Sequence, residues 1–205
     1  MAGSSADSST GRYLAPISPP PADDLDLDVQ LQGIIAGVTG LPDTNVFPRW
    51  QPVAPRLPNI DETWVAVGAT DETSFDTPAL THNGAGDGSS TLTSTYRVEV
   101  LASFYGPRGN AYARLVSDGL WVSQNREGML RQGLALRDVG PLRRVPVIAN
   151  TGSQRRTDLT LTFLRVVART LPIRNVAQAI GTIVAADVGP TSPSVSTEPF
   201  ATTEP

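Results

Sequence analysis

The sequence contains no cysteine and no lysine, and it has a single histidine. The absence of cysteine excludes a disulfide framework, a thiolate nucleophile and a cysteine-ligated metal site. No apolar run approaches the roughly 18 residues that a membrane-spanning helix needs, so we expect no membrane partner. The opening stretch, MAGSSADSST, lacks a basic region and an apolar core, so we expect no signal peptide and expect synthesis in a cytoplasm.

Enzymatic chemistry finds little support in the remaining residues. The lone histidine, His82, has no nucleophile on a G-x-S-x-G elbow to activate, and only carboxylates could complete a zinc site around it. Neither a phosphate-binding loop nor a G-x-G-x-x-G motif is present. We therefore expect no enzyme and no cofactor, and we interpret His82 as an exposed loop residue or a contact between proteins. A small ligand-binding or hydrolytic domain that uses His82 and nearby acids is the alternative from a different class.

Two acidic stretches resemble calcium loops only superficially. Asp24, Asp26 and Asp28 match the start of an EF-hand loop, but Val29 occupies the position where that loop needs glycine. Asp87 lies between two glycines, as in calcium-binding repeats, yet the motif occurs once. We expect a capped helix at the first stretch, a surface loop at the second, and no metal at either.

The basic residues, all arginine, are distributed unevenly. The first 100 residues hold 4 arginines and 13 acidic residues, a net charge of −9, whereas the other 105 hold 12 and 7, a net charge of +5. Such asymmetry allows the acidic face of one copy to meet the basic face of the next, as a head-to-tail ring requires. An ordinary solvated surface is the alternative. Tight binding of DNA is not expected from a chain with a pI of about 4.9.

Local patterns predict helices and strands in alternation. Asp23 or Asp24 is expected to cap a helix whose apolar stripe is Leu27, Leu31, Ile34, Ile35 and Val38 and which ends at Gly40. A short edge strand is predicted at 45–50, and a second strand at 63–69. A polar loop at 70–90 is expected to project as a finger. The long strand that follows, from Tyr96, alternates apolar and polar residues up to a turn at Gly106 and Pro107.

The second half continues this pattern. A helix laid on the sheet is expected, in which Ala111, Leu115 and Leu120 recur with Tyr112, Val116 and Gly119 at three- and four-residue spacing. A short helix with Met129 and Leu130 inward is expected to follow. Strand pieces are predicted at 134–139 and 142–148, a long strand at 155–170 and a final strand at 177–186. The fold class is therefore α+β, with a mixed, mainly antiparallel sheet, helices on one face and long projecting strands. We expect an extended arm at 1–22, one domain at 23–187 and a Pro/Ser/Thr-rich arm at 188–205, and expect partners to order the arms.

Several separated blocks together resemble a known family. They are RWQP at 49–52, GDG at 86–88, SFYGP at 103–107 and AYARLVSDGLWVSQNRE at 111–127. In this order, within a similarity that covers residues 12–185, they resemble the tail terminator (neck) proteins of long-tailed bacteriophages. The resemblance implies a structural protein of the virion.

The resemblance also implies an assembly and a location. Proteins of this kind form a homohexameric ring that caps the tail tube, ends tail polymerisation and provides the docking surface for the head. The implied partners are tail tube protein, possibly tail sheath, and neck or head-completion proteins, with DNA passing transiently through the lumen. The implied location is the head-proximal end of the tail, after assembly in the host cytoplasm. A head-completion or neck adaptor bound to the portal is the alternative. As candidate interface residues we select Arg49, Trp50, His82, Asp87, Arg155 and Arg156.

Overall fold

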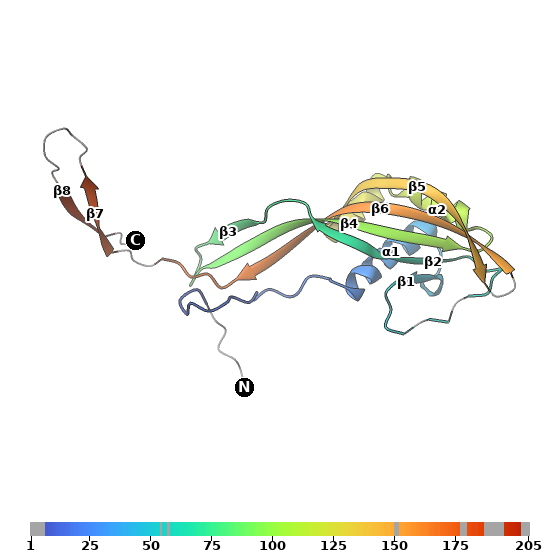
Figure 1. Cartoon of the computed structure of the whole chain (residues 1–205), viewed down its shortest axis with the longest axis horizontal. Coiled ribbons are helices and arrows are strands. Elements are labelled where there is room, and N and C mark those ends of the chain that lie inside the picture. Colours follow the sequence, from blue (N-terminus) through green and yellow to red (C-terminus); the bar gives the residue numbers. More distant parts are fainter. Residues whose placement is uncertain are drawn as a thin grey trace. The chain divides into compact units, whose positions relative to one another are not determined.

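The computed structural model describes residues 7–53, 55–56, 58–149, 152–176, 180–186 and 195–201. The chain divides into two compact units (Figure 1). The larger unit comprises residues 18–81 and 92–169, and the smaller unit takes its residues from 1–17, 82–91 and 170–205. The smaller unit is therefore assembled from three segments that lie far apart in the sequence.

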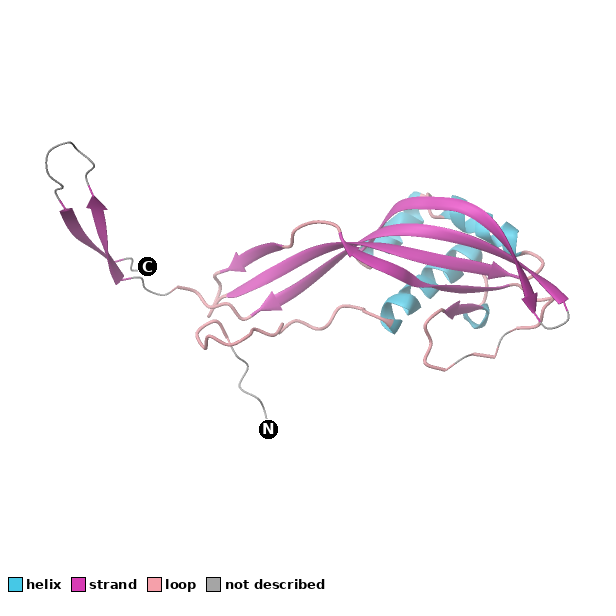
Figure 2. Ribbon diagram, viewed as in Figure 1, coloured by secondary structure: helices cyan, strands magenta, loops and turns pink. Residues whose placement is uncertain are grey.

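The fold is α+β, as the sequence predicts (Figure 2). Its main sheet has the strand order β1-β2-β4-β6-β5, and β3 pairs with β4. The strands are β1 Val46–Pro48, β2 Trp64–Ser74, β3 Ala79–Asn83, β4 Ser89–Tyr105, β5 Leu134–Ala149 and β6 Gly152–Leu171. The helices that pack on it are α1 Leu25–Thr39, α2 Gly109–Gly119 and α3 Ser123–Arg131, and a 3-10 helix spans Asp43–Asn45. Strand β1 pairs with β2 in parallel, whereas the pairs β2–β4 and β5–β6 are antiparallel.

Helix α1 packs through the stripe that its sequence predicts. Leu27, Leu31 and Ile35 are at most 3% exposed, and the left-handed Gly40 at φ 67° ends the helix. Asp24 occupies the N-cap position, but its side chain makes no capping hydrogen bond. Asp28 lies in the first turn of α1 and is buried.

Strand β4 provides the centre of the core. Val98, Val100, Ala102 and Phe104 alternate along it and are fully buried, which confirms the predicted half-buried strand. The turn after β4 depends on Gly106, whose φ is +90°: a Cβ there would lie 2.2 Å from the carbonyl oxygen of Glu62. Any side chain at this position would therefore displace neighbouring backbone.

The predicted loop at 70–90 is wrong. Strand β2 continues to Ser74, β3 follows at Ala79–Asn83, and β4 begins at Ser89, before Tyr96. Residues 71–83 are exposed, so no face is apolar and the alternation that signals a strand is absent. Backbone pairing supplies the structure instead, with Glu72 opposite Val98 in the β2–β4 ladder.

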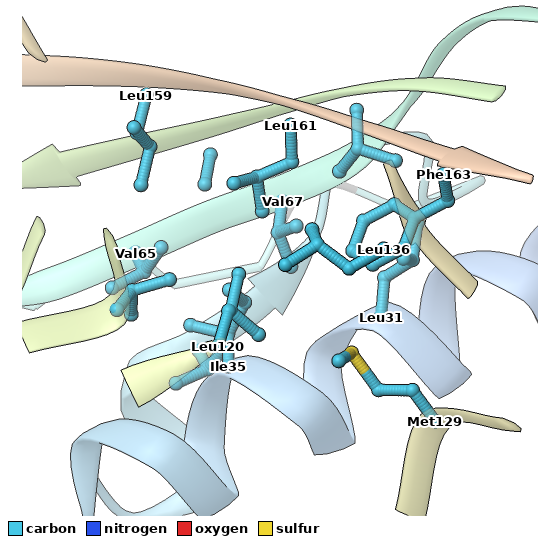
Figure 3. Close-up of a cluster of buried hydrophobic side chains, with 14 of the residues drawn as sticks. Leu31, Ile35, Val65, Val67, Leu120, Met129, Leu136, Leu159, Leu161 and Phe163 are labelled. Carbon is cyan, nitrogen blue, oxygen red and sulfur yellow. The ribbon is translucent and has the colours of Figure 1, made fainter. Parts of the chain in front are cut away.

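The predicted inward faces of the second and third helices are partly wrong. In α2, Val116 of the predicted pattern is buried, as is Leu120 just beyond the helix, but Ala111 is exposed, Leu115 is 46% exposed, and Ala113 is buried instead. In α3, Met129 is buried as expected, but Leu130 is 58% exposed. A short helix offers too few apolar residues to fix its rotation from the sequence alone. Figure 3 shows Leu120 and Met129 directed toward the side chains of α1 and the sheet.

The two long strands after α3 confirm the predicted pieces. Strand β5 is continuous, with register shifts at Leu136/Asp138 and at Val139/Leu142, where Gly140 and Pro141 interrupt the ladder. Strand β6 runs for 20 residues and buries Leu159, Leu161 and Phe163 on one face.

A second sheet, of two strands, lies near the C-terminus. Strand β7 spans Ile180–Ala186 and pairs antiparallel with β8, Val195–Ala201. The predicted strand at 177–186 is thus β7, its first three positions lying outside the described residues. The sequence predicts no strand at β8, because that stretch resembles the Pro/Ser/Thr-rich arm around it. Of the predicted arm, residues 188–194 and 202–205 lie outside the described residues.

Residues 7–17 of the N-terminal arm are held by the chain itself. The backbone N–H of Ser8 donates to the carbonyl of Pro172 at 3.1 Å, and that of Ile17 donates to Thr170 at 2.8 Å. Asp7 accepts a salt bridge from Arg174 at 2.7 Å. This part of the arm therefore has a partner within its own chain, contrary to the expectation that other proteins order it.

We expect Leu120→Ala to lower the free energy of unfolding by about 2–5 kcal/mol, because it leaves a cavity where the side chain is fully buried. Leu115→Ala, at an exposed position five residues earlier, is the matched control and is expected to change it by no more than about 0.5 kcal/mol. Urea unfolding followed by circular dichroism measures both. Equal losses would show that α2 does not have the orientation described.

Candidate assembly surfaces

Arg49 is an internal anchor as well as a candidate contact residue. Its Nη2 donates to the carbonyl of Ala66 at 3.3 Å and to Ser103 Oγ at 2.8 Å, so it links the end of β1 to β2 and β4. Burial lowers the pKa of Arg49, because the charged guanidinium loses solvation. These bonds direct the guanidinium into the protein.

Asp28 reaches the same region from α1. Its Oδ1 accepts the backbone N–H of Ala69 at 2.9 Å, while its Oδ2 is buried without a hydrogen-bond partner. Burial raises the pKa of Asp28, and the backbone N–H of Ala69 and the charge of Arg49 act in the opposite direction. Gly68 makes room for this arrangement, because a Cβ there would lie 2.8 Å from Cβ of Arg49 and 3.0 Å from Asp28 Oδ2. The polar contacts of Asp28 and Arg49 thus join helix α1, the end of β1 and strand β2.

Trp50 lies at the surface beside these polar contacts. Its side chain is 61% exposed, and its Nε1 donates to the carbonyl of Ala69 at 2.7 Å. The hydrogen bond fixes the indole while most of its surface faces solvent. A tryptophan that is exposed and held in place is a common centre of protein contacts. Trp50 does not pack in the core.

Arg156 ends a stack of aromatic rings where β2 begins and β4 ends. Trp64 and Tyr105 are stacked with centroids 4.0 Å apart, and the guanidinium of Arg156 lies 5.7 Å from the centre of the Tyr105 ring. Asp158 receives two hydrogen bonds from Arg156, at 2.7 and 2.8 Å. These bonds raise the pKa of Arg156. Its charge is therefore neutralised locally and serves the fold.

Arg155 belongs to a basic pocket of about 710 Å³. The pocket lies between the β4–α2 turn and strands β5 and β6. Its lining includes four arginines and no acidic residue: Gly106, Pro107, Arg108, Asn110, Ala111, Arg144, Val145, Pro146, Gln154, Arg155, Arg156 and Thr157. Arg108, Arg144 and Arg155 are exposed, and none of the three forms an ion pair within the described part of the chain. An acidic surface or a phosphate suits such a pocket.

His82 joins two segments of the smaller unit. Its Nδ1 lies 2.9 Å from Ser90 Oγ, and its Nε2 lies 2.9 Å from Oδ1 of Asn175. The amide of Asn175 donates to the carbonyls of Gly84 and Gly86, so its oxygen faces the histidine, and Nε2 carries the proton. Ser90 is 2% exposed and lies too deep to act as a nucleophile. The hydrogen bonds of His82 with Ser90 and Asn175 therefore hold the two segments together rather than forming a hydrolytic site. We call these three residues the clasp.

The selected residues therefore occupy separate places. Arg49 and Trp50 lie at the end of β1, Arg155 and Arg156 lie at the basic pocket, and His82 belongs to the clasp. Asp87 is exposed in the smaller unit, and its backbone carbonyl accepts the N–H of Asn175 at 3.0 Å. The sequence gives no signal for Asn175 or for the buried Asp28, whereas the adjacent pair Arg143 and Arg144 is visible in it as a basic cluster.

Two negative findings apply to the described residues. They contain no group of three or more His, Asp or Glu side chains placed to hold a metal ion. Among them, no helix is both long and apolar enough to pass through a lipid bilayer.

Comparison with known proteins identifies the family. The family model of the phage neck terminator protein matches residues 25–189, which include the whole main sheet and its helices. No curated protein matches the chain. The chain belongs to the phage neck (tail) terminator family, a structural kind of protein and a component of the virion at the tail.

We expect the stability of Asp28→Asn relative to the native chain to rise with pH. The folded state keeps a proton on Asp28 that the unfolded state releases near the ordinary carboxyl pKa of 3.8. The native protein therefore loses stability as pH increases from 3.8 through the raised pKa of Asp28, and the asparagine variant lacks this loss. Urea midpoints between about pH 3 and pH 7 measure the difference. Asp26→Asn, exposed on the same helix, is the control; a difference that does not change with pH would contradict the prediction.

We expect His82→Ala to loosen the clasp without unfolding the larger unit. It removes two hydrogen bonds, each contributing about 0.5–1.5 kcal/mol, so the backbone amide of Asn175 is expected to exchange faster with deuterium. Hydrogen exchange with mass spectrometry measures residues 82–91 and 170–176, and Thr81→Ala, an exposed neighbour, is the control. Stoichiometric zinc in the native protein, or loss of a hydrolytic activity in the variant, would contradict this role.

Proposed function

We propose that the chain forms a homohexameric ring on the last ring of the tail tube, at the head-proximal end of the tail. The ring ends tail polymerisation and provides the docking surface for the head through neck or head-completion proteins. Its partners are the tail tube protein and, in a contractile tail, the sheath. DNA passes through its lumen, and assembly takes place in the host cytoplasm. Membership of the neck terminator family supports this function.

The opposite charge of the two sheet edges carries the proposal. At the β1 edge and the adjoining start of α1, Asp26 and Asp43 are exposed, and Arg49, directly after β1, is directed inward. Five exposed arginines and two exposed acids lie along α3 and β5 at the other edge: Arg126, Glu127, Arg131, Arg137, Asp138, Arg143 and Arg144. One copy can thus present its acidic edge to the basic edge of the next, and repetition of this contact closes a ring when the rotation permits.

Neither edge is open to the addition of another strand. Gln32 donates to the carbonyl of Val46 at 2.6 Å and to that of Asp43 at 3.2 Å, which covers the outer side of β1. Strand β5 contains Pro141 and Pro146 and two register shifts. Contacts between copies are therefore made by side chains, and the charges of these edges decide which surfaces meet.

The basic pocket extends the positive side of the subunit. Its arginines contact an acidic surface in the assembled tail, and the same charge tolerates DNA in the lumen through weak, non-specific contacts. The net charge of −4 is consistent with this weak contact. Tight binding would hinder the passage of DNA.

We expect Arg144→Glu combined with Arg155→Glu to reduce ring formation on tubes about tenfold or more and to give tails of irregular length. Both side chains are exposed at the basic pocket, whereas Arg156 is left unchanged because its salt bridge with Asp158 belongs to the fold. Electron microscopy of assembled tails measures occupancy of the tail end and tail length. Arg97→Glu, exposed on β4 outside the pocket, is the control.

The imaging also tests the proposed function directly. The expected particle has sixfold symmetry and a mass of about 130 kDa, six times the 21.7 kDa chain. Assignment of the chain to another part of the virion, or to another symmetry, would refute the proposal.

A further inference from the structure

We propose that an apolar groove on the α1–β1 side of each subunit receives the corner between α2 and α3 of the next copy. This inference rests on the proposed ring and specifies which surfaces make it. The groove is a hollow with acidic residues beside it, whereas the corner is an apolar knob with an arginine beside it. The two also lie at different positions on the subunit.

The groove has a volume of about 390 Å³. Its lining is mostly apolar and contains one charged residue: Leu25, Val29, Gln32, Asp43, Val46, Phe47, Pro48, Gln51, Pro52 and Val53. Val29 and Val53 are 49% and 76% exposed, which is unusual for branched apolar side chains that line one hollow. Asp26, which is exposed, follows Leu25 at the start of α1, and Asp43 belongs to the lining itself. The groove therefore suits an apolar knob that carries positive charge beside it.

The α2–α3 corner has these properties. Trp121 and Val122 form the connection between the helices and are 50% and 52% exposed. The guanidinium of Arg126 lies 5.9 Å from the centre of a Trp121 ring, which places a positive charge at the side of the indole. Tryptophan and arginine are the residues most enriched at the centres of protein interfaces. The corner is thus an apolar knob with a basic flank.

The two surfaces belong to different parts of the helical layer. Helix α1 packs on β1 and β2 and also contacts α2, whereas α2 and α3 pack on β5, so the groove lies beside β1 and the corner at the α2–α3 connection. A heterologous contact needs two different surfaces placed in this way, and a surface that pairs with itself would give only a dimer. The partner that matches in shape, charge and position is therefore a second copy of the chain.

Cross-linking tests this contact, and the chain has no native cysteine to interfere. Val29→Cys combined with Val122→Cys places one thiol in the groove and one at the corner, both at positions about half exposed. On purified tails, a short bis-maleimide is expected to give a covalent ladder that ends at six chains. Each single variant is expected to give no product larger than one chain, because the two thiols of neighbouring copies would face different surfaces.

A second pair of variants measures the contribution of the corner. Trp121→Ala is expected to weaken ring occupancy about 30-fold, the size of a loss at an interface centre. Leu80→Ala is the control, because Leu80 is a large apolar side chain that is 56% exposed on β3 and belongs neither to the two surfaces nor to the basic edge. Circular dichroism establishes that both variants are folded.

The outcomes separate the contact from the ring. Sixfold rings without a ladder in the double variant, or equal occupancy for Trp121→Ala and Leu80→Ala, would overturn this contact and leave the proposed function standing. Dimers from either single variant would show a self-paired interface and overturn it as well. Absence of the chain from the tail end would refute the proposed function and the contact together.

Discussion

The hydrogen bonds of one half-buried guanidinium connect three strands on the β1 side of the subunit. Arg49 joins the end of β1 to the backbone of β2 and to Ser103 of β4, and Asp28 brings α1 to the same place through Ala69. A buried charge is costly unless hydrogen bonds compensate it, so these positions tolerate little change. The same bonds hold β1 at the edge of the sheet and place Trp50 outside it, so the groove and its acidic flank follow from a contact in the interior.

The two kinds of charge in the subunit therefore have separate tasks. Arg49, Arg156 and Arg165 are paired within the protein; Arg165, which is 5% exposed, bonds to Asp23 and Glu72 and ties the approach to α1 onto β6. The arginines of the basic edge, together with Arg108 and Arg155 of the pocket, face solvent. A fold that uses arginine for both purposes gains planar, directional donors inside and a positive surface outside. The exclusive use of arginine in this chain is consistent with both tasks.

The sequence predicts the parts of the fold that bury an apolar face. Helix α1, the stretch of β4 from Tyr96 to Tyr105 and strand β6 each combine a clear period with a glycine or proline boundary. The structure confirms them, although β4 begins seven residues earlier, at Ser89. The exposed parts of β2 and β3 have no apolar face, and the short helices α2 and α3 carry too few apolar residues to fix their rotation, so Leu115 and Leu130 are misplaced. Among the candidate residues, the sequence identifies Arg49, His82 and Arg155 as notable. It does not reveal that His82 bonds to Asn175, 93 positions away, because only the folded chain brings them together.

The smaller unit also constrains the order in which the chain folds. Its bonds join Asp7 to Arg174 and His82 to Asn175, so its first two segments form these bonds only after residues 170–176 have been synthesised. The core of the larger unit likewise needs Leu159, Leu161 and Phe163 of β6. Contacts between such distant positions form slowly, since a long loop of chain must close before they provide any stabilisation. A nascent chain that has not reached β6 therefore has no closed core and cannot present the surfaces described above.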